Sequence, residues 1–131
     1  MKVTQISVFL ENRPGRLAHL LRVLSDAQVN LRALSLADTA DFGIARAIVS
    51  DTDAAMRAIQ AAGLTAATTE VLRVEIPDVP GGLARTVVEP LAQAGVNIEY
   101  MYAYSERPSE KAVVVLKVND LEKAERVLSG G

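Results

Sequence analysis

Two short stretches of the sequence combine residue types that could bind a small charged ligand. "LENRPGRL" (residues 10–17) and "IPDVPGGL" (residues 76–83) each end an apolar run with Pro-Gly and lead into a leucine-rich helical pattern. Proline suits the first turn of a helix and glycine allows a tight corner, so each stretch predicts a strand–turn–helix corner. A helix start also presents unpaired backbone N–H groups and partial positive charge, which favour a carboxylate.

A polar side chain precedes each of these prolines by two residues. Asn12 lies before Pro14, and Asp78 lies before Pro80. An asparagine amide both donates and accepts hydrogen bonds, and an aspartate can pair with an ammonium group. An α-amino acid needs both kinds of partner, so the two corners are candidate sites for one. The alternative is that Asn12 and Asp78 only shape or cap the turn.

A second asparagine pair recurs at the start of a predicted strand. Asn30 lies in "QVNLRALSLA" and Asn97 in "GVNIEYMYAY". Asparagine is poorly suited to a strand interior. Its presence in both stretches therefore indicates a shared role, either a turn-capping hydrogen bond or a ligand contact.

These matches belong to an internal repeat that covers the chain. Pro80 corresponds to Pro14 and Asn97 to Asn30. The two prolines are 66 positions apart and the two asparagines are 67 positions apart. Hydrophobic periodicity and turn signals predict a β-α-β-β-α-β order in each copy, with the copies divided into residues 1–69 and 70–131. In the first copy the expected strands are residues 3–10, 29–38, 42–51 and 64–68, with helices opening at Pro14-Gly15 and near Asp51, the latter ending at Gly63. A strand over 71–76 starts the second copy, and that copy ends before its last strand.

The second copy carries one extra residue in its first helix. Leu17 to Leu24 spans seven positions, whereas Leu83 to Leu91 spans eight, and Pro90 lies at that point. A proline inside a helix removes a hydrogen bond and clashes with the carbonyl four residues back. We therefore predict a kink or a one-turn π-bulge that absorbs the extra residue. The other insertions fall in the turn "SERPSEKA", residues 105–112.

The composition excludes several classes of protein. The 131 residues are 50% hydrophobic with a formal net charge of −2, and the chain has no cysteine and one histidine. Disulfides, thiolate metal sites and multi-histidine metal sites are therefore excluded, and the scattered basic residues do not resemble a nucleic-acid binder. We expect no catalytic residues, no metal and no cofactor. Without a signal peptide or an apolar segment of membrane length, we expect a cytoplasmic protein.

The segment "NRPGRLAHLLRVLSDAQVNLRALSL", followed by a strand, a helix and a strand, resembles the ACT domain. This is a small amino-acid-binding regulatory module of ferredoxin-like fold, and the whole chain resembles a tandem ACT protein. The resemblance implies an α+β fold of two βαββαβ repeats packed side by side through their second strands. Antiparallel sheets would carry helices on one face, and the second repeat would lack its last strand. In serine-sensing ACT domains the loop begins His-x-Asn; Leu10 and Asn12 hold these positions here, which favours a more apolar ligand.

The resemblance also implies where a ligand binds. The loop over residues 12–17 would face residues 97–100, and the loop over 78–83 would face residues 30–34, giving two non-equivalent sites per chain. The implied ligand-binding residues are Asn12, Arg13, Pro14, Gly15, Arg16, Leu17, Asn30, Leu31, Asp78, Val79, Pro80, Gly81, Gly82, Leu83, Asn97, Ile98 and Tyr100.

Three tyrosines alternate along the strand that contains Tyr100. Tyr100, Tyr102 and Tyr104 share one face of that strand, and small residues occupy the matching positions Ala33, Ser35 and Ala37. If the two strands are neighbours, the large face and the small face can interlock. The alternatives are a stacking platform for RNA bases, which the acidic net charge disfavours, and a surface that covers a partner subunit.

The function implied by the resemblance is regulatory and not enzymatic. The protein would sense an amino acid and modulate a partner enzyme of amino-acid metabolism, and we expect a homodimer. The alternative is a structural interaction subunit that binds no ligand, resembling an acetolactate synthase small subunit. The open edge left by the incomplete second repeat supports this alternative, because such edges pair with other chains.

Overall fold

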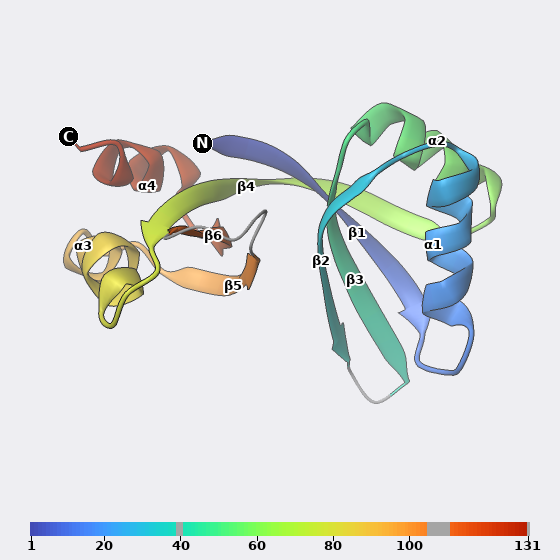
Figure 1. Cartoon of the computed structure of the whole chain (residues 1–131), viewed down its shortest axis with the longest axis horizontal. Coiled ribbons are helices and arrows are strands. Elements are labelled where there is room, and N and C mark those ends of the chain that lie inside the picture. The colour runs from blue at the N-terminus through green and yellow to red at the C-terminus, as the bar shows by residue number, and fades with distance from the viewer. Residues whose placement is uncertain (39–40, 105–110, 131) are drawn as a thin grey trace. The chain divides into compact units, whose positions relative to one another are not determined.

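The computed structural model describes residues 1–38, 41–104 and 111–130 (Figure 1). These residues divide into two compact units. One, here the N-terminal unit, is Thr4–Thr69; the other, the C-terminal unit, combines Met1–Val3 with the residues from Glu70 onward. In chain order the elements are β1 (Lys2–Glu11), α1 (Arg16–Asp26), β2 (Leu31–Asp38), β3 (Phe42–Val49), α2 (Thr52–Ala61), β4 (Thr65–Pro77), the π-helix η1 (Ala84–Val88), α3 (Glu89–Gln93), β5 (Ile98–Tyr104), β6 (Lys111–Val118) and α4 (Leu121–Leu128).

The N-terminal unit is an antiparallel sheet with two helices on one face. Its strand order is β2-β3-β1-β4, with only the first residues of β4 belonging to it. Alternate residues of a strand face the same side, and the register places Ile6 opposite Ala47 and Val8 opposite Ala45. These side chains form one buried cluster with leucines of α1 and Ile59 of α2. The helices α1 and α2 therefore cover the apolar face of this sheet (Figure 1).

The C-terminal unit repeats this plan with β4, β5 and β6. β4 and β6 are antiparallel, with Leu72 opposite Leu116 and Val74 opposite Val114. These four side chains form a second buried cluster with residues of the helices, including Leu91 and Ala124. The fold class predicted from the sequence, two ferredoxin-like repeats of antiparallel strands and helices, is confirmed.

The N-terminus of the chain takes the place of the last strand that the second repeat lacks. In the strand order β1 lies beside β4, and Met1–Val3 belong to the C-terminal unit. The backbone N–H of Arg73 donates to the carbonyl oxygen of Met1 at 2.8 Å. The Lys2 ammonium lies 2.8 Å from a carboxylate oxygen of Glu122 and 3.7 Å from one of Glu125, both on α4. The hydrogen bond with Glu122 raises the pKa of Lys2 above its usual value.

The predicted π-bulge is confirmed. The five residues of η1 form a π-helix, and the backbone N–H of Glu89 donates to the carbonyl oxygen of Ala84, five residues back. Pro90 follows directly in α3, and the π-turn lies where the proline ring would otherwise clash with the carbonyl four residues back. The wider turn therefore absorbs the extra residue just before the proline.

One predicted break in the chain is wrong. The sequence predicts a short strand over residues 64–68 that runs into a second over 71–76, but β4 is one strand of 13 residues. No glycine or proline separates Thr68 from Val71, and threonine and valine both favour extended backbone. The predicted cap is confirmed, because the Asp51 carboxylate accepts the N–H of Ala54 at 3.0 Å. The insertion predicted in "SERPSEKA" falls largely on residues 105–110, outside the described residues.

Candidate ligand site

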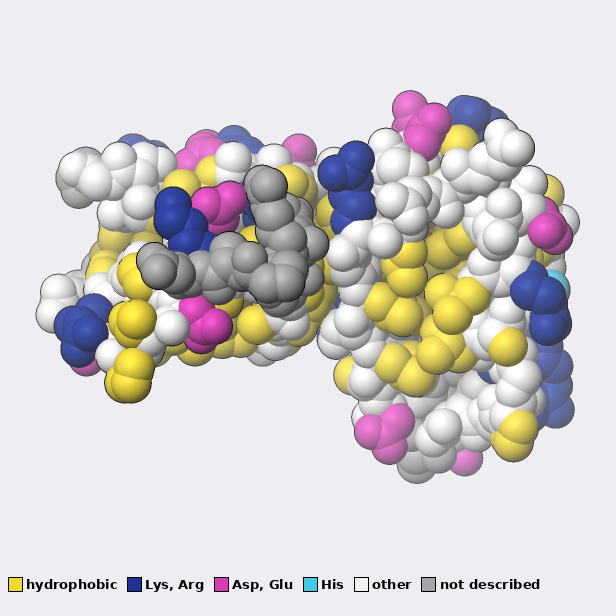
Figure 2. Space-filling model, viewed as in Figure 1, with side chains coloured by type: hydrophobic (Ala, Val, Ile, Leu, Met, Phe, Trp, Pro, Cys, Tyr) yellow, Lys and Arg dark blue, Asp and Glu magenta, His cyan; other side chains and the backbone are white. Residues whose placement is uncertain are grey.

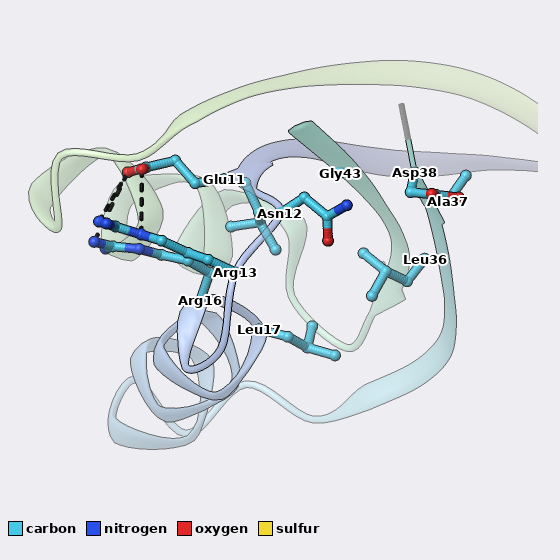
Figure 3. A pocket seen from close by; sticks show the side chains of 10 residues that line it. Glu11, Asn12, Arg13, Arg16, Leu17, Leu36, Ala37, Asp38 and Gly43 are labelled. Carbon is cyan, nitrogen blue, oxygen red and sulfur yellow. Dashed lines mark hydrogen bonds and ion pairs between the residues drawn. The ribbon is translucent and has the colours of Figure 1, made fainter. Parts of the chain in front are cut away.

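A cavity of about 270 Å³ opens at the corner of the N-terminal unit where β1 leads into α1 (Figure 3). It lies among the end of β1, the corner, the first turn of α1, the end of β2 and the start of β3. The lining residues are Leu10, Glu11, Asn12, Arg13, Arg16, Leu17, Leu36, Ala37, Asp38 and Gly43. All ten belong to the N-terminal unit.

Backbone hydrogen bonds hold the corner in a tight turn. The N–H of Asn12 donates to the carbonyl oxygen of Asp41 at 3.1 Å, which joins the end of β1 to the loop before β3. The N–H of Arg13 donates to the carbonyl oxygen of Glu11 at 2.9 Å. Gly15 then caps α1 with a φ of 89°, a left-handed conformation that glycine adopts without steric cost. These contacts hold Asn12 close to the N-terminus of α1.

The first turn of α1 has no side chain that caps it. Gly15 stands at the N-cap and offers no side-chain oxygen, and the first turn contains no acidic residue. By contrast, α2 and α4 are capped by Asp51 and Asp120. The N–H of Arg16 donates to the carbonyl oxygen of Arg13 at 3.4 Å. The next N–H groups of the first turn, with the partial positive charge of the helix start, are therefore left for an external acceptor.

The cavity wall is divided between apolar and polar or charged side chains. Leu10, Leu17, Leu36 and Ala37 provide the apolar surface. The side-chain amide of Asn12 extends toward the side of the cavity where Leu36 lies (Figure 3). Such an arrangement suits a ligand with one apolar end and one polar, hydrogen-bonding end.

Two arginines at the rim share one carboxylate. The Glu11 side chain accepts from Arg13 through both of its oxygens, at 3.2 Å from Nε and 3.3 Å from Nη2. Nη2 of Arg16 lies 3.7 Å from the same carboxylate (Figure 3). Glu11 therefore neutralises one of the two positive charges, and Asp38 adds a second carboxylate to the lining.

The predicted residues of the first corner line two hollows. Asn12, Arg13, Arg16 and Leu17 line the cavity. Pro14 and Gly15 line a second hollow, here called the outer hollow, to which Arg13 and Arg16 also contribute.

Asn30 and Leu31 lie away from this cavity. They belong to the opposite end of β2, where they line another hollow of about 440 Å³. At roughly 3.3 Å a residue, the length of β2 puts about 20 Å between them and Asp38. The backbone N–H of Asn30 donates to the Ser50 hydroxyl at 2.9 Å, and the Ser50 N–H donates to the Asn30 carbonyl at 2.9 Å. The structure thus shows Asn30 joining the start of β2 to the residue before the cap of α2.

Asn97 makes the equivalent link in the C-terminal unit. Its backbone N–H donates to the side-chain oxygen of Asn119 at 2.9 Å, and the Asn119 N–H donates to the Asn97 carbonyl at 3.1 Å. In both repeats it is therefore the backbone of the asparagine that makes the link.

The second corner is held by hydrogen bonds among its own residues and Arg85. It joins β4 to η1 and contains the predicted site residues Asp78, Val79, Pro80, Gly81, Gly82 and Leu83. The N–H of Gly82 donates to the carbonyl oxygen of Val79 at 2.9 Å. The guanidinium of Arg85 donates to the carbonyl oxygen of Pro80 at 3.2 Å and lies against Gly81. Arg85 holds the position that His19 has in the first repeat, so the two repeats place different side chains at this point of the corner.

The predicted residues Ile98 and Tyr100 lie on β5. Tyr100, Tyr102 and Tyr104 are opposite Lys117, Val115 and Val113 of β6, so the three tyrosines share a face as predicted. The intervening β6 residues, such as Val114 and Leu116, belong to the buried cluster with the helices. The tyrosines therefore lie on the opposite face, where the Tyr104 hydroxyl accepts from Nε of Arg73 at 3.2 Å. The interlock with Ala33, Ser35 and Ala37 requires β2 beside β5, but in the strand order of the described residues β2 lies beside β3 and β5 lies beside β6. Both sites expected between the repeats stay predictions.

Sequence reasoning missed six of the ten residues that line the cavity. Leu10 and Glu11, at the end of β1, and Leu36, Ala37, Asp38 and Gly43 were not among the predicted site residues. The resemblance directed attention to the start of β2, whereas the cavity uses its end. Antiparallel pairing was the available signal. Because β1 and β2 are both antiparallel to β3, they run in the same direction and finish at the same end of the sheet.

Within the described residues, no group of three His, Asp or Glu side chains could hold a metal ion. None of the helices over those same residues is long and apolar enough to cross a membrane.

The comparison with known proteins agrees with this fold. The family model described as an ACT domain pair matches residues 1–129. The crystal structure of protein BT0572 from Bacteroides thetaiotaomicron is 40% identical, with a TM-score of 0.92, and the match covers 99% of this chain and 88% of that chain. The regulatory subunit of aspartate kinase from Thermus flavus is 19% identical with a TM-score of 0.67, over 97% of this chain and 90% of that one. The ligand-free subunit from Thermus thermophilus is 20% identical with a TM-score of 0.65, over 96% and 88%. No curated protein matches.

Proposed function

Because the chain belongs to the ACT domain pair family, we propose that it is a regulatory module that binds a small amino acid and modulates a partner enzyme of amino-acid metabolism. The observation that supports this function is the cavity of about 270 Å³ in the N-terminal unit. There the uncapped start of α1, the Asn12 amide and the Asp38 carboxylate meet a wall of leucines. These are the partners that an α-amino acid requires.

Each group of the ligand has a candidate partner. The ligand carboxylate would accept from the N–H groups of the first turn of α1 and from the Asn12 amide. The ammonium group would pair with Asp38, which lines the cavity at the end of β2. The side chain would pack on Leu10, Leu17 and Leu36. This wall favours an aliphatic or aromatic amino acid over a polar one, because a buried polar side chain would lose hydrogen bonds to water.

Regulation requires that the ligand stabilise one state of the protein over another. We place the protein in the cytoplasm as a homodimer. The strand β2 supports the dimer, because it ends the strand order of the N-terminal unit and such edges pair with other chains. The ligand would then stabilise one arrangement of the repeats or of the dimer, and the partner enzyme would respond to that arrangement. No reaction is assigned to the protein itself.

The direct test is a thermal-shift screen of the purified protein against the twenty amino acids. A ligand at a hundred times its dissociation constant adds about 2.7 kcal/mol to the free energy of unfolding, which shifts Tm by several degrees. We expect one aliphatic or aromatic amino acid to stabilise the protein. Absence of any shift at millimolar concentration would refute ligand sensing and favour a structural subunit.

Variants then locate the site. Asn12→Ala and Asp38→Ala should each weaken binding at least tenfold, as measured by isothermal titration calorimetry. Asn30→Ala is the matched control, because Asn30 lies outside the cavity and its link to Ser50 uses the backbone. Asp78→Ala tests the second corner in the same way. Wild-type affinity in the Asn12→Ala/Asp38→Ala double variant would contradict this assignment.

A further inference from the structure

The outer face of α1 in the N-terminal unit carries a stripe of basic side chains. Arg16, His19 and Arg22 recur at every third position of α1, so each is a neighbour of the next on the helix surface, and Arg13 lies in the corner just before the helix. Together with Pro14 and Gly15 they line an open hollow of about 400 Å³, and no acidic residue is among its lining. Figure 2 shows basic side chains beside the single histidine at the edge of this unit, and they are arginines because the unit contains no lysine.

The first two arginines already converge on an anion. Arg13 and Arg16 both lie within 4 Å of the Glu11 carboxylate, at 3.2 Å and 3.7 Å. Glu11 carries one negative charge against two guanidiniums. No hydrogen bond or ion pair joins the side chain of Arg22 or His19 to another residue of the described ranges. The stripe therefore keeps about two uncompensated positive charges, in a chain whose formal net charge is −2.

The second repeat shows that the fold does not require this stripe. At the matching positions of that repeat stand Val79, Gly82, Arg85 and Val88, so one cation replaces the three arginines and the histidine. Arg85 donates to the carbonyl oxygen of Pro80 in its own turn. The same strand–turn–helix corner thus forms in this chain without a basic stripe, so folding does not require these basic residues.

We propose that this outer hollow binds a small polyphosphate anion, either inorganic or carried by a nucleotide. Planar guanidiniums bind phosphate oxygens through two parallel hydrogen bonds, and three of them suit a ligand with two or more negative charges. A single carboxylate would leave part of the charge uncompensated, as Glu11 does. Arg22 and His19 line this hollow and not the leucine-walled cavity. Arg13 and Arg16 line both hollows, so Arg22 and His19 are the residues that separate this proposal from amino-acid binding.

The test is a calorimetric titration of the full chain with sodium tripolyphosphate, ATP and adenosine in turn. We expect tripolyphosphate to bind wild type and to lose at least tenfold in affinity in Arg22→Ala. Arg57→Ala is the matched control, because Arg57 is an exposed arginine on α2 that lies outside the hollow. ATP that binds more tightly than tripolyphosphate would identify a nucleotide as the source, whereas equal affinities with no binding of adenosine would identify the phosphate chain alone.

Several results would overturn the proposal. They are no binding of tripolyphosphate at millimolar concentration, equal binding of sodium sulfate at matched ionic strength, and unchanged affinity in Arg22→Ala. Tighter binding of an octaglutamate peptide than of tripolyphosphate would identify an acidic protein segment, and not a polyphosphate, as the ligand. Arg22 is exposed and outside the cavity, so Arg22→Ala should keep the wild-type Tm and amino-acid affinity. That pair of readouts separates failure of this proposal from failure of the proposed function.

Discussion

The two corners of the chain have the same topology but different tolerance for side chains, and Gly82→Ala tests this difference. Gly82 is buried in the turn between β4 and η1. A methyl group at Gly82 would overlap the backbone carbonyl oxygen of Pro77 and lie 3.5 Å from Cγ2 of Val79. The first repeat holds Arg16 at the matching position, so the two turns differ in how closely the strand end approaches the helix.

The cost follows from what the methyl group would meet. A carbonyl oxygen of the main chain cannot rotate away as a flexible side chain can, so the whole turn must shift. Overpacking of this kind costs about 1–3 kcal/mol. For a chain of this length, that corresponds to a fall in Tm of roughly 3–5 °C for each kcal/mol. The free energy of unfolding should be measured by urea denaturation followed by circular dichroism.

Gly43→Ala is the matched control for Gly82→Ala. A methyl group at Gly43 would lie 3.4 Å from a terminal carbon of Leu36 and 3.5 Å from the carbonyl oxygen of Ala37, which are ordinary contacts. Alanine also suits a strand interior better than glycine does. Gly43→Ala should therefore change stability by less than about 0.5 kcal/mol, within the range of mild substitutions. Equal stability of Gly82→Ala and wild type would refute the reasoning about the second corner.

Two further predictions concern stability. The hydrogen bond to Glu122 raises the pKa of Lys2 above its usual value, so the ammonium stabilises the folded state at pH values below the unfolded pKa and this contribution is lost as the pH rises through the folded pKa. Urea midpoints should therefore fall more steeply for wild type than for Lys2→Met above pH about 10. Parallel curves would contradict the contact. Asp51→Ala and Asp120→Ala should each cost about 1 kcal/mol, because each carboxylate accepts a backbone N–H in the first turn of its helix. Asparagine at either position should restore most of that loss in thermal melts, and a similar loss in the asparagine variants would argue against capping.

Local signals in the sequence were sufficient for most of the fold. The repeated Pro-Gly corners and the hydrophobic periodicity predicted the order of strands and helices. The comparison of leucine spacing between copies, together with Pro90, predicted the π-helix. The polar residue before a helical pattern predicted the cap at Asp51. Each of these features depends on neighbours within a few residues, which one sequence displays directly.

Features that depend on distant residues could not be predicted in the same way. The strand missing from the second repeat is replaced by Met1–Val3, and so short a segment carries no pattern that assigns it to a partner in the other half of the chain. The cavity lining likewise depends on register. Asp38 and Asn12 line one cavity because both β1 and β2 pair with β3. A resemblance gives a family's arrangement but not the register of this particular sheet.

The central claim is that the corner of the N-terminal unit is the amino-acid site, and a nuclear magnetic resonance titration tests it most directly. Nitrogen-15-labelled protein is titrated with the amino acid that gives the largest thermal shift. The largest amide shift changes are expected on residues 10–13, 15–17 and 36–38 and on Gly43, which line the cavity or its corner. Changes confined to Asn30 and Leu31, or to the residues from Glu70 onward, would contradict it.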